Sequence, residues 1–389
     1  FGSSLARRLH SFSSPPFLRR TGLELGRSAE MGTGEESYSM KVKLASGAGG
    51  TFGVDDIAVA WATSGGFWAR EGLDVEWTPV RGGVMAANAV LAGEVDGGYG
   101  TWLPCVHAHR EGKPLKILVS MAQSLAQNLM VNRARITSPA ELRGKRWAVD
   151  GIGALSHTQA QLIVRGLGLP DSEIEYVASG PPPQRIAALL SGEVDCSLVR
   201  AEEATVLARQ YPEQLALLLG FPEILPLAPM QPHGVISVTA AFADEHPEVC
   251  SALVRGLVKA SRSLHDNLED FRQAVRDHVT QRPEALGPRV DVSDEEVQSI
   301  WQHEHDAGSF AVNGGLTKAH WAAELQVYAD LRGDAGATAL TLEDFALPDF
   351  LASALADLGV HSAAHDRPEP PSIGDTGVGA AAGSGSSGT

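Results

Sequence analysis

Small and polar residues that suit a ligand site follow short apolar segments that have the pattern of β-strands. One group is Gly49–Gly53, after the alternating segment Lys41–Ala45, and another is Gly98–Trp102, after the segment Val95–Tyr99. Glycine lets the backbone approach a ligand closely, while hydroxyl groups and rings supply hydrogen bonds and a stacking face. From these two groups we expect ligand contacts by Gly50, Thr51, Phe52, Thr101 and Trp102.

Two further groups would place fixed donors opposite an acidic part of a ligand. Gly151–His157 leads into a helical stretch, and the free backbone N–H groups at a helix start favour carboxylate, sulfonate or phosphate groups. Arg200 follows the apolar segment Val194–Val199, and its guanidinium suits an acidic group. We expect ligand contacts by Gly153, Ser156, His157 and Arg200.

Each candidate also has a purely structural interpretation, which the sequence leaves open. The alternatives are a flexible turn for Gly49–Gly53, a core position for Trp102, a helix N-cap for Ser156, a solvated surface position for His157, and an ion pair with Glu202 or Glu203 for Arg200.

Two histidine pairs and one cysteine suggest a metal site or a nucleophile. His107 with His109, and His303 with His305, are two residues apart on segments with a helical pattern. Such positions point about 200° apart around a helix, so neither pair can hold one metal ion. We predict no metal site and no cofactor. Cys105 is a candidate nucleophile beside His107 or His109, and a buried structural thiol is the alternative.

A repeated phrase indicates two similar halves. Leu91–Asp96 returns as Leu190–Asp195, 99 positions later (190 − 91 = 99). Around both copies, short apolar segments alternate with helical stretches, which is typical of a mostly parallel sheet covered by helices on both faces. Two such lobes imply a cleft between them, where small molecules bind. We expect Asp96 and Asp195 to serve strand ends or helix caps.

From Thr239 onward the pattern changes to amphipathic helices without strands between them. The expected helices are Pro247–Asn267, Ser293–His305, Leu316–Leu331 and Phe345–Leu355. We expect this helical third to pack back over one or both lobes.

Composition excludes several classes of protein. The 389 residues include 31 basic and 47 acidic ones, and the net charge of −16 argues against a nucleic-acid-binding surface. No apolar run is long enough to span a membrane. The three cysteines, an odd number without a C-x-x-C pair, indicate no disulfide framework.

The two ends differ from the body of the chain. The first 23 residues contain Arg7, Arg8, Arg19 and Arg20 and no acid, as in an organellar transit peptide; upstream sequence is the alternative. We predict residues 1–40 to be disordered or a targeting segment, and residues 361–389 to be a disordered Gly/Ser-rich tail. These features favour the cytoplasm or an organelle, with the periplasm as the alternative if the N-terminus is incomplete.

Three segments resemble the signatures of one family. Gly65–Glu76 resembles its "G-[FY]-[FW]-x-x-E-G-L-x-V-E" phrase, and Gly82–Asp96 resembles its Gly-Gly start, Ala-rich helix and Leu-Ala-Gly-Glu-Val-Asp ending. Pro139–Arg146 resembles its "L-x-G-K" entry into a second lobe. The chain is thus similar, over about residues 41–260, to nitrate/sulfonate/taurine-type periplasmic substrate-binding proteins, which are grouped with thiamine-pyrimidine-synthesis proteins.

This resemblance implies an α/β, two-lobed type II periplasmic-binding-protein fold that closes about a hinge around a small ligand. Lobe one would comprise residues 41–130 plus 236–360, and lobe two residues 131–235. The chain would cross between lobes near 128–133 and 233–238, which adds His233 as a candidate ligand contact.

The function implied is solute binding. The ligand would be a small anionic or heteroaromatic molecule of the sulfonate, nitrate, pyrimidine or aromatic acid class, and an ABC-type permease would be the partner. We expect a monomer.

Enzymes on the same scaffold provide the alternative. Thiamine-pyrimidine synthases use pyridoxal phosphate, iron and a cysteine-rich segment, whereas this chain has no cysteine cluster and no lysine between Lys43 and Lys113. Leu342–Leu351 resembles the end of an aromatic desulfinase, but the first loop lacks that enzyme's nucleophilic cysteine. A desulfinase, decarboxylase or thiamine-pathway enzyme stays the alternative to a binding protein.

Overall fold

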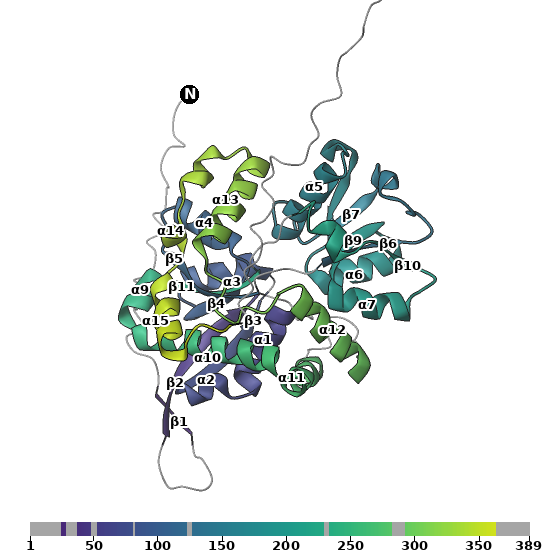
Figure 1. Ribbon diagram of the computed structural model, residues 1–389. Helices are drawn as coiled ribbons and strands as arrows, with labels where there is room; N and C mark the ends of the chain where they lie inside the picture. Colours follow the sequence, from purple (N-terminus) through teal and green to yellow (C-terminus); the bar gives the residue numbers. More distant parts are fainter. Residues whose placement is uncertain are drawn as a thin grey trace, which may run out of the picture.

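The computed structural model describes residues 25–28, 37–47, 53–80, 82–122, 127–228, 233–281 and 292–362. These residues form two α/β lobes side by side (Figure 1), which confirms the predicted fold class. In these ranges no helix is both long and apolar enough to cross a membrane. Gly50, Thr51 and Phe52 lie outside the described residues.

Lobe one is built on a six-stranded sheet. Its strand order is β1-β2-β4-β11-β5. β1 pairs with β2 along Ser37–Met40, and β3 pairs with β2 along Met40–Ser46. The strands are β1 (Leu25–Ser28), β2 (Ser37–Ser46), β3 (Leu73–Pro79), β4 (Gly97–Gly100), β5 (Leu115–Ala122) and β11 (His233–Thr239). β1 and the start of β2 pair within residues 1–40, a segment that the sequence analysis treats as disordered or targeting.

Lobe two is built on a five-stranded sheet of order β10-β6-β9-β7-β8. The strands are β6 (Gln127–Asn132), β7 (Arg146–Val149), β8 (Glu175–Ala178), β9 (Cys196–Arg200) and β10 (Leu215–Leu219). The chain passes between the sheets after β5 and again after β10. The expected crossings at 128–133 and 233–238 therefore lie within β6 and β11, and the exact lobe boundaries stay a prediction.

Both sheets are mixed rather than mostly parallel. The β-α-β parts are parallel, since β2 pairs with β3 and β4 in this way, as β7 does with β8 and β9. The strands at the crossings are antiparallel: β6 to β9, and β11 to both β4 and β5. A strand that returns from the other lobe enters its sheet from the opposite end, and the local sequence pattern carries no sign of this reversal.

Helices cover the faces of both sheets. Those of the β-α-β parts are α1 (Val54–Ser64), α2 (Phe67–Arg70), α3 (Gly82–Leu91), α4 (Leu103–Arg110), α5 (Leu155–Gly166), α6 (Pro182–Ser191), α7 (Ala201–Gln210) and α8 (Phe221–Ile224). Single 3₁₀ turns occupy Pro139–Leu142, Asp171–Glu173 and Ala335–Ala339.

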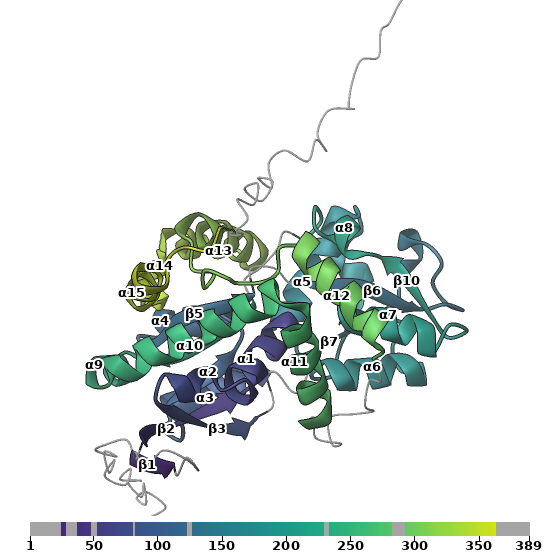
Figure 2. The ribbon, with the colours of Figure 1, turned by 60° about the horizontal axis from the view of Figure 1, so that its bottom comes forward.

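The C-terminal part is helical, as predicted. Its helices are α9 (Ala240–Glu245), α10 (Pro247–Asp266), α11 (Leu268–Gln281), α12 (Asp294–Asp306), α13 (Lys318–Arg332), α14 (Leu342–Phe345) and α15 (Pro348–Leu358). The long α10 lies across lobe one, while α12 lies next to α7 of lobe two (Figure 2). There Arg209 of α7 donates to Glu296 of α12 at 2.7 Å, while Trp301 of α12 donates to the Leu264 carbonyl of α10 at 2.8 Å, so α12 contacts both lobes.

The repeated aspartates join neighbouring strands in both lobes, which confirms their predicted structural role. In lobe one, the Asp96 carboxylate accepts the backbone N–H of Lys43 at 2.7 Å, and the Asp96 N–H donates to the Lys43 carbonyl. In lobe two, Asp195 makes the same pair of bonds with Arg146, at 2.9 and 2.8 Å. The arginines beside Asp195 hold the pKa of its carboxyl near 2, although its burial acts in the opposite direction.

Candidate functional site

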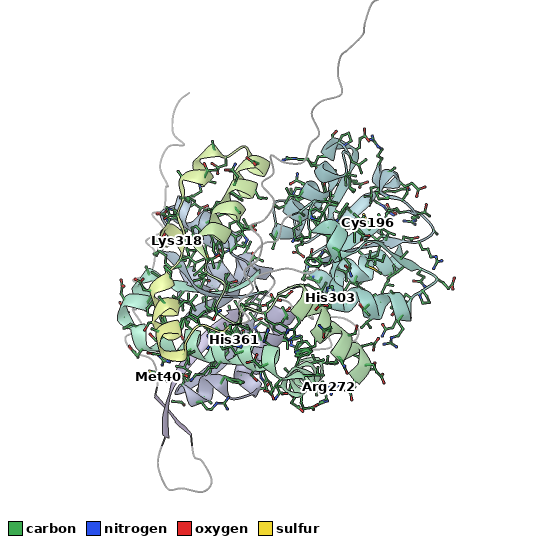
Figure 3. The ribbon with its side chains drawn as sticks, viewed as in Figure 1. Met40, Cys196, Arg272, His303, Lys318 and His361 are labelled. Carbon is green, nitrogen blue, oxygen red and sulfur yellow. The ribbon has the colours of Figure 1, made fainter. Side chains whose placement is uncertain are left out.

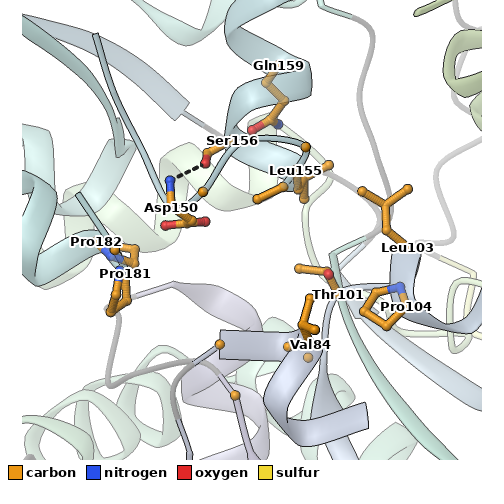
Figure 4. Close-up of a pocket in the computed structure, with 18 of the residues that line it drawn as sticks. Val84, Thr101, Leu103, Pro104, Asp150, Leu155, Ser156, Gln159, Pro181 and Pro182 are labelled. Atoms are coloured by element: carbon orange, nitrogen blue, oxygen red, sulfur yellow. Dashed lines mark hydrogen bonds between the residues drawn. The ribbon is translucent and has the colours of Figure 1, made fainter. Parts of the chain in front are cut away.

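A cavity of about 750 Å³ lies between the lobes. Its lobe-one wall comes from Gly47, the start of α3, the segment Tyr99–Thr101 and the start of α4; its lobe-two wall comes from Gln127, the segment Asp150–Ser156, Gln159, the start of α6 and Arg200. Tyr328 of α13 adds a residue from the helical C-terminal part. Figure 4 shows Val84 and Thr101 on one side, opposite Asp150 and Ser156. The volume lies within the range of about 300–1,000 Å³ that is usual for small-molecule sites.

Backbone alone forms part of the lobe-one wall. Three segments meet at Gly47, Gly83 and Gly100, where a Cβ on Gly100 would lie 2.7 Å from Gly83 Cα. A Cβ on Gly47 would lie 2.8 Å from the backbone of the Gly82–Gly83 pair. No larger residue fits without displacing main chain, so these glycines are needed for close approach. Thr101 follows directly and lines the cavity.

The lobe-two wall begins with a loop that is stiffened by its own side chains. The Asp150 N–H donates to the Ser156 hydroxyl at 2.8 Å (Figure 4). The Gly153 N–H donates to His157 Nδ1 at 3.0 Å, and the imidazole ring packs edge-on against Tyr176. Gly153 has φ +87°, a left-handed conformation that favours glycine. The loop therefore keeps its shape at the start of α5.

Two glutamine side chains give the cavity its free polar groups. Gln127 and Gln159 are 7% and 8% exposed, and both line the cavity. Among the described residues, neither Oε1 atom has a hydrogen-bond partner. A buried amide oxygen without a partner is costly. Each of these oxygens therefore suits a donor group on a bound molecule.

The charged side chains that line the cavity have protein partners. Arg185 and Asp150 lie 3.1 Å apart on the lobe-two side. His107 Nε2 lies 2.8 Å from the Tyr328 hydroxyl. The starts of α3, α4, α5 and α6 all border the cavity, and the positive ends of their dipoles favour a negative group there.

A buried ionic cluster joins the two lobes beside the cavity. Arg200 of lobe two donates to the Asp55 carboxylate of α1 at 2.9 and 3.2 Å, and both side chains are almost fully buried. The Tyr99 hydroxyl lies 2.9 Å from Asp55 and 2.8 Å from Asp56. A hydroxyl has one proton to donate, so the second contact requires a protonated carboxyl. Burial, together with the charge of Asp55, raises the pKa of Asp56 well above its usual value and provides that proton.

We expect Asp56→Asn to change how stability depends on pH. In the wild type, a raised folded-state pKa gives a contribution that is complete below about pH 4 and is lost as pH rises through that pKa. Asparagine has no such proton, and its amide oxygen accepts from Tyr99. Above pH 4, the free energy of unfolding of the wild type should therefore fall relative to that of Asp56→Asn, by at most about 1.4 kcal/mol per pH unit.

Urea unfolding of both proteins between pH 4.5 and 8 measures this difference. The matched control is Asp74→Asn, on the exposed face of β3, which should track the wild type at every pH. Parallel curves for Asp56→Asn and the wild type would show that Asp56 is ionised in the folded protein.

The structure brings part of the predicted site together. Thr101, Gly153, Ser156 and Arg200 line the cavity. Ser156 and Arg200 already hold protein partners there, since Ser156 accepts from Asp150 and Arg200 pairs with Asp55 of lobe one. Only the backbone of His233 is described; it pairs with Ala122 at the start of β11. Contact of these residues with a ligand stays a prediction.

Two candidates lie away from the cavity, and the structural interpretation holds for one of them. Trp102 is 1% exposed, and its indole packs edge-on against Trp321 at 5.5 Å. Trp102 directly precedes α4, and its indole lies in the core of lobe one. His157 is buried rather than solvated, and its ring accepts the Gly153 N–H and so helps to position the loop.

Cys105 also belongs to the core. It is 1% exposed and does not line the cavity, and burial raises the pKa of its thiol to about 12. A thiol in that state is a poor nucleophile at neutral pH.

Several cavity residues were missed by the sequence analysis. They are Gln127, Asp150, Gln159, Arg185 and Tyr328, together with His107, which the sequence analysis considered only for a metal site or beside Cys105. Gln159 follows Ser156 by three positions on one helix, so helical spacing would have placed them on the same face. Tyr328 comes from a distant helix, and no local signal points to it.

Solved structures with the same fold include bacterial and fungal proteins. The chain is 17% identical to a periplasmic sulfonate-binding protein of Methylobacillus flagellatus, with a TM-score of 0.57 over 83% of this chain and 96% of that one. It is 16% identical to the periplasmic nitrate-binding protein of Synechocystis, with a TM-score of 0.62 over 83% and 90%. A Candida albicans gene product with the generic periplasmic binding protein fold is 15% identical, with a TM-score of 0.53 over 81% and 94%.

At the level of sequence, no curated protein matches the chain. The family model described as "NMT1/THI5 like" matches residues 55–269. The match covers more than half of the 389 residues, including every residue that lines the cavity except Gly47 and Tyr328. The protein belongs to the NMT1/THI5-like family.

Proposed function

We propose that the protein is a solute-binding protein that captures a small anionic or heteroaromatic molecule in the cavity between its lobes. The observation that carries the proposal is the cavity between the lobes, which is bordered by the starts of four helices that favour a negative group and by the Gln127 and Gln159 amide oxygens, which suit a donor group. Hinge closure over the ligand is part of the proposal, because the cavity is bounded by both lobes.

The volume and the wall chemistry favour an organic ligand over a bare inorganic ion. A cavity of about 750 Å³ is large for nitrate alone. Four helix starts favour a negative group, such as a carboxylate or sulfonate. The glutamine amides suit the donor and acceptor edge of a ring or amide. Sulfonates, pyrimidines and aromatic acids combine such features.

The similar structures named as periplasmic support the periplasmic alternative for location rather than the cytoplasmic one. The sulfonate-binding neighbour is described as part of an ABC transporter, which supports an ABC-type permease as the partner.

Native mass spectrometry of the freshly purified protein tests for a co-purified ligand and its mass. Thermal shifts against sulfonates, nitrate, pyrimidines and aromatic acids then identify the class. We expect one class to raise Tm and to be recovered unchanged after incubation. Conversion of that compound to product would instead favour the alternative, an enzyme on the same scaffold.

We expect Gln159→Leu to weaken binding of the identified ligand about tenfold, which corresponds to about 1.4 kcal/mol. The change removes the buried amide and keeps most of the side-chain volume. The matched control is Gln161→Leu on the same helix, since Gln161 bonds to Asp171 at 3.0 Å and does not line the cavity. Isothermal titration gives both values of Kd. Equal Kd values for Gln159→Leu and the wild type would place the ligand elsewhere.

A further inference from the structure

Three potential metal ligands from distant parts of the chain meet on lobe one, outside the cavity. His265 and Asp266 form the C-terminal end of α10, and His361 follows α15. His265 Nδ1 lies 2.7 Å from an Asp266 oxygen, and His361 Nε2 lies 3.1 Å from both Asp266 oxygens. One donor atom from each residue lies within 4.8 Å of the other two. Figure 3 labels His361, which lies in the lobe that carries α10.

The segment that carries His361 is held in place by a network centred on Arg262 of α10. Arg262 donates to the carbonyls of Leu358 and Gly359 and to the Asn313 side chain. Asn313 in turn accepts the His361 N–H at 2.8 Å and donates to the His361 carbonyl. These bonds fix the backbone on both sides of the His361 imidazole. The position opposite Asp266 is therefore set by the fold and not by the imidazole's own contact.

His265 is fixed as well. Its carbonyl lies 2.7 Å from His305 Nε2, and the two imidazole rings contact each other at a tilt of 44°, with centroids 4.1 Å apart. His265 is buried, whereas the Asp266 side chain is about half exposed (52%). The cluster thus has a rigid, buried base and one side open to solvent.

Two imidazoles and a carboxylate are the ligand types that Zn²⁺ binds, at about 2.0–2.2 Å. Neighbouring donors of a tetrahedral site at that distance are about 3.4 Å apart. The spacing in this cluster, from 2.7 Å to less than 4.8 Å, brackets that value. In a complex, His265 Nδ1 and His361 Nε2 would direct their lone pairs at the ion, whereas both nitrogens now face the Asp266 carboxylate. Three protein ligands leave one position for water on the exposed side.

We propose that His265 Nδ1, the Asp266 carboxylate and His361 Nε2 form a binding site for a zinc-class divalent cation. The ion would clip the chain after α15 to the end of α10. The site is independent of the solute cavity, because none of its three residues lines that cavity. The proposal departs from the expectation of no metal site, which rested on histidine pairs that are close in sequence.

Isothermal titration of Zn²⁺ into the full chain, freed of metal by a chelator, tests the proposal. We expect one site per chain, with an affinity at least tenfold lower in His361→Ala and in Asp266→Asn. The matched control is His246→Ala, which removes an imidazole from the other end of α10 and should bind Zn²⁺ as the wild type does. Wild-type affinity in His361→Ala, or no saturable binding in the wild type, would overturn the proposal.

A second measurement uses no variant and therefore does not depend on how the variants fold. Deuterium uptake by the backbone amides of residues 358–361 should fall when Zn²⁺ is added to the wild type, since the ion would hold this segment against α10. Uptake that is unchanged at saturating Zn²⁺ would show that bound zinc lies elsewhere and would equally overturn the assignment.

Discussion

Arg200→Met should destabilise the folded protein by about 3–5 kcal/mol, because it leaves buried acidic groups without their cation. Arg200 bonds to Asp55, while Asp56 lies beside both and Glu203 is buried nearby. Methionine fills much of the arginine volume, so the loss reports charge and hydrogen bonding rather than a void. Urea unfolding at pH 7 measures the effect.

The matched control for this experiment is Arg209→Met, near the C-terminal end of α7, the helix that begins directly after Arg200. Arg209 also links α7 to a separate helix through Glu296, but its side chain is 55% exposed. Exposed ion pairs contribute about 0–1 kcal/mol, so this variant should stay close to the wild type.

A double variant separates the energy of the Arg200–Asp55 ion pair from that of the other contacts of Arg200. Adding Asp55→Asn to Arg200→Met should restore part of the loss, since it removes the isolated carboxylate. If Arg200→Met cost no more than Arg209→Met, the contact between the lobes would be open in solution.

Trp102→Ala should also destabilise the protein by about 3–5 kcal/mol, through loss of buried area and the cavity it leaves. Trp102 packs against Trp321 and Tyr328 in the core of lobe one. The effect should appear as a lower urea midpoint, and the number of bound ligands should not change. Unchanged stability with lost ligand binding would favour the stacking role that the sequence analysis considered.

Trp102→Phe serves as the conservative comparison. The Trp102 indole N–H is buried and has no hydrogen-bond partner among the described residues. Its removal therefore leaves no polar group stranded, and phenylalanine keeps most of the packing. We expect a cost below about 1.5 kcal/mol. A cost equal to that of Trp102→Ala would mean that the indole N–H has a partner in solution.

The two-lobed fold was predictable because its signals are local and occur twice. The repeated Leu-Ala/Ser-Gly-Glu-Val-Asp phrase marks a helix end and the next strand in each lobe, and both aspartates make the same pair of backbone bonds. Loops after strands were the right places to look for the cavity, since Thr101, Gly153 and Ser156 all line it. Each of these loops begins where a strand ends, and the apolar pattern of that strand is visible in the local sequence.

Contacts between distant segments were not predictable in this way. Arg200 and Asp55 are 145 positions apart, so no sequence pattern near Arg200 indicates their ion pair. Trp102 follows Thr101 directly, yet Thr101 lines the cavity while the Trp102 indole is buried in the core of lobe one. The same reasoning about spacing excluded adjacent histidines as metal ligands and had no means of pairing His265 with His361.

The meeting of Gly47, Gly83 and Gly100 has a consequence for how ligand preference changes in evolution. A wall made of main chain has no side chain to exchange, and adding a Cβ there would push whole segments apart. New ligand preferences must therefore arise through side chains beside these glycines, such as Val84 and Thr101 on lobe one and Gln127 and Gln159 on the facing lobe. The backbone contact stays fixed, while the side chains that border it can vary.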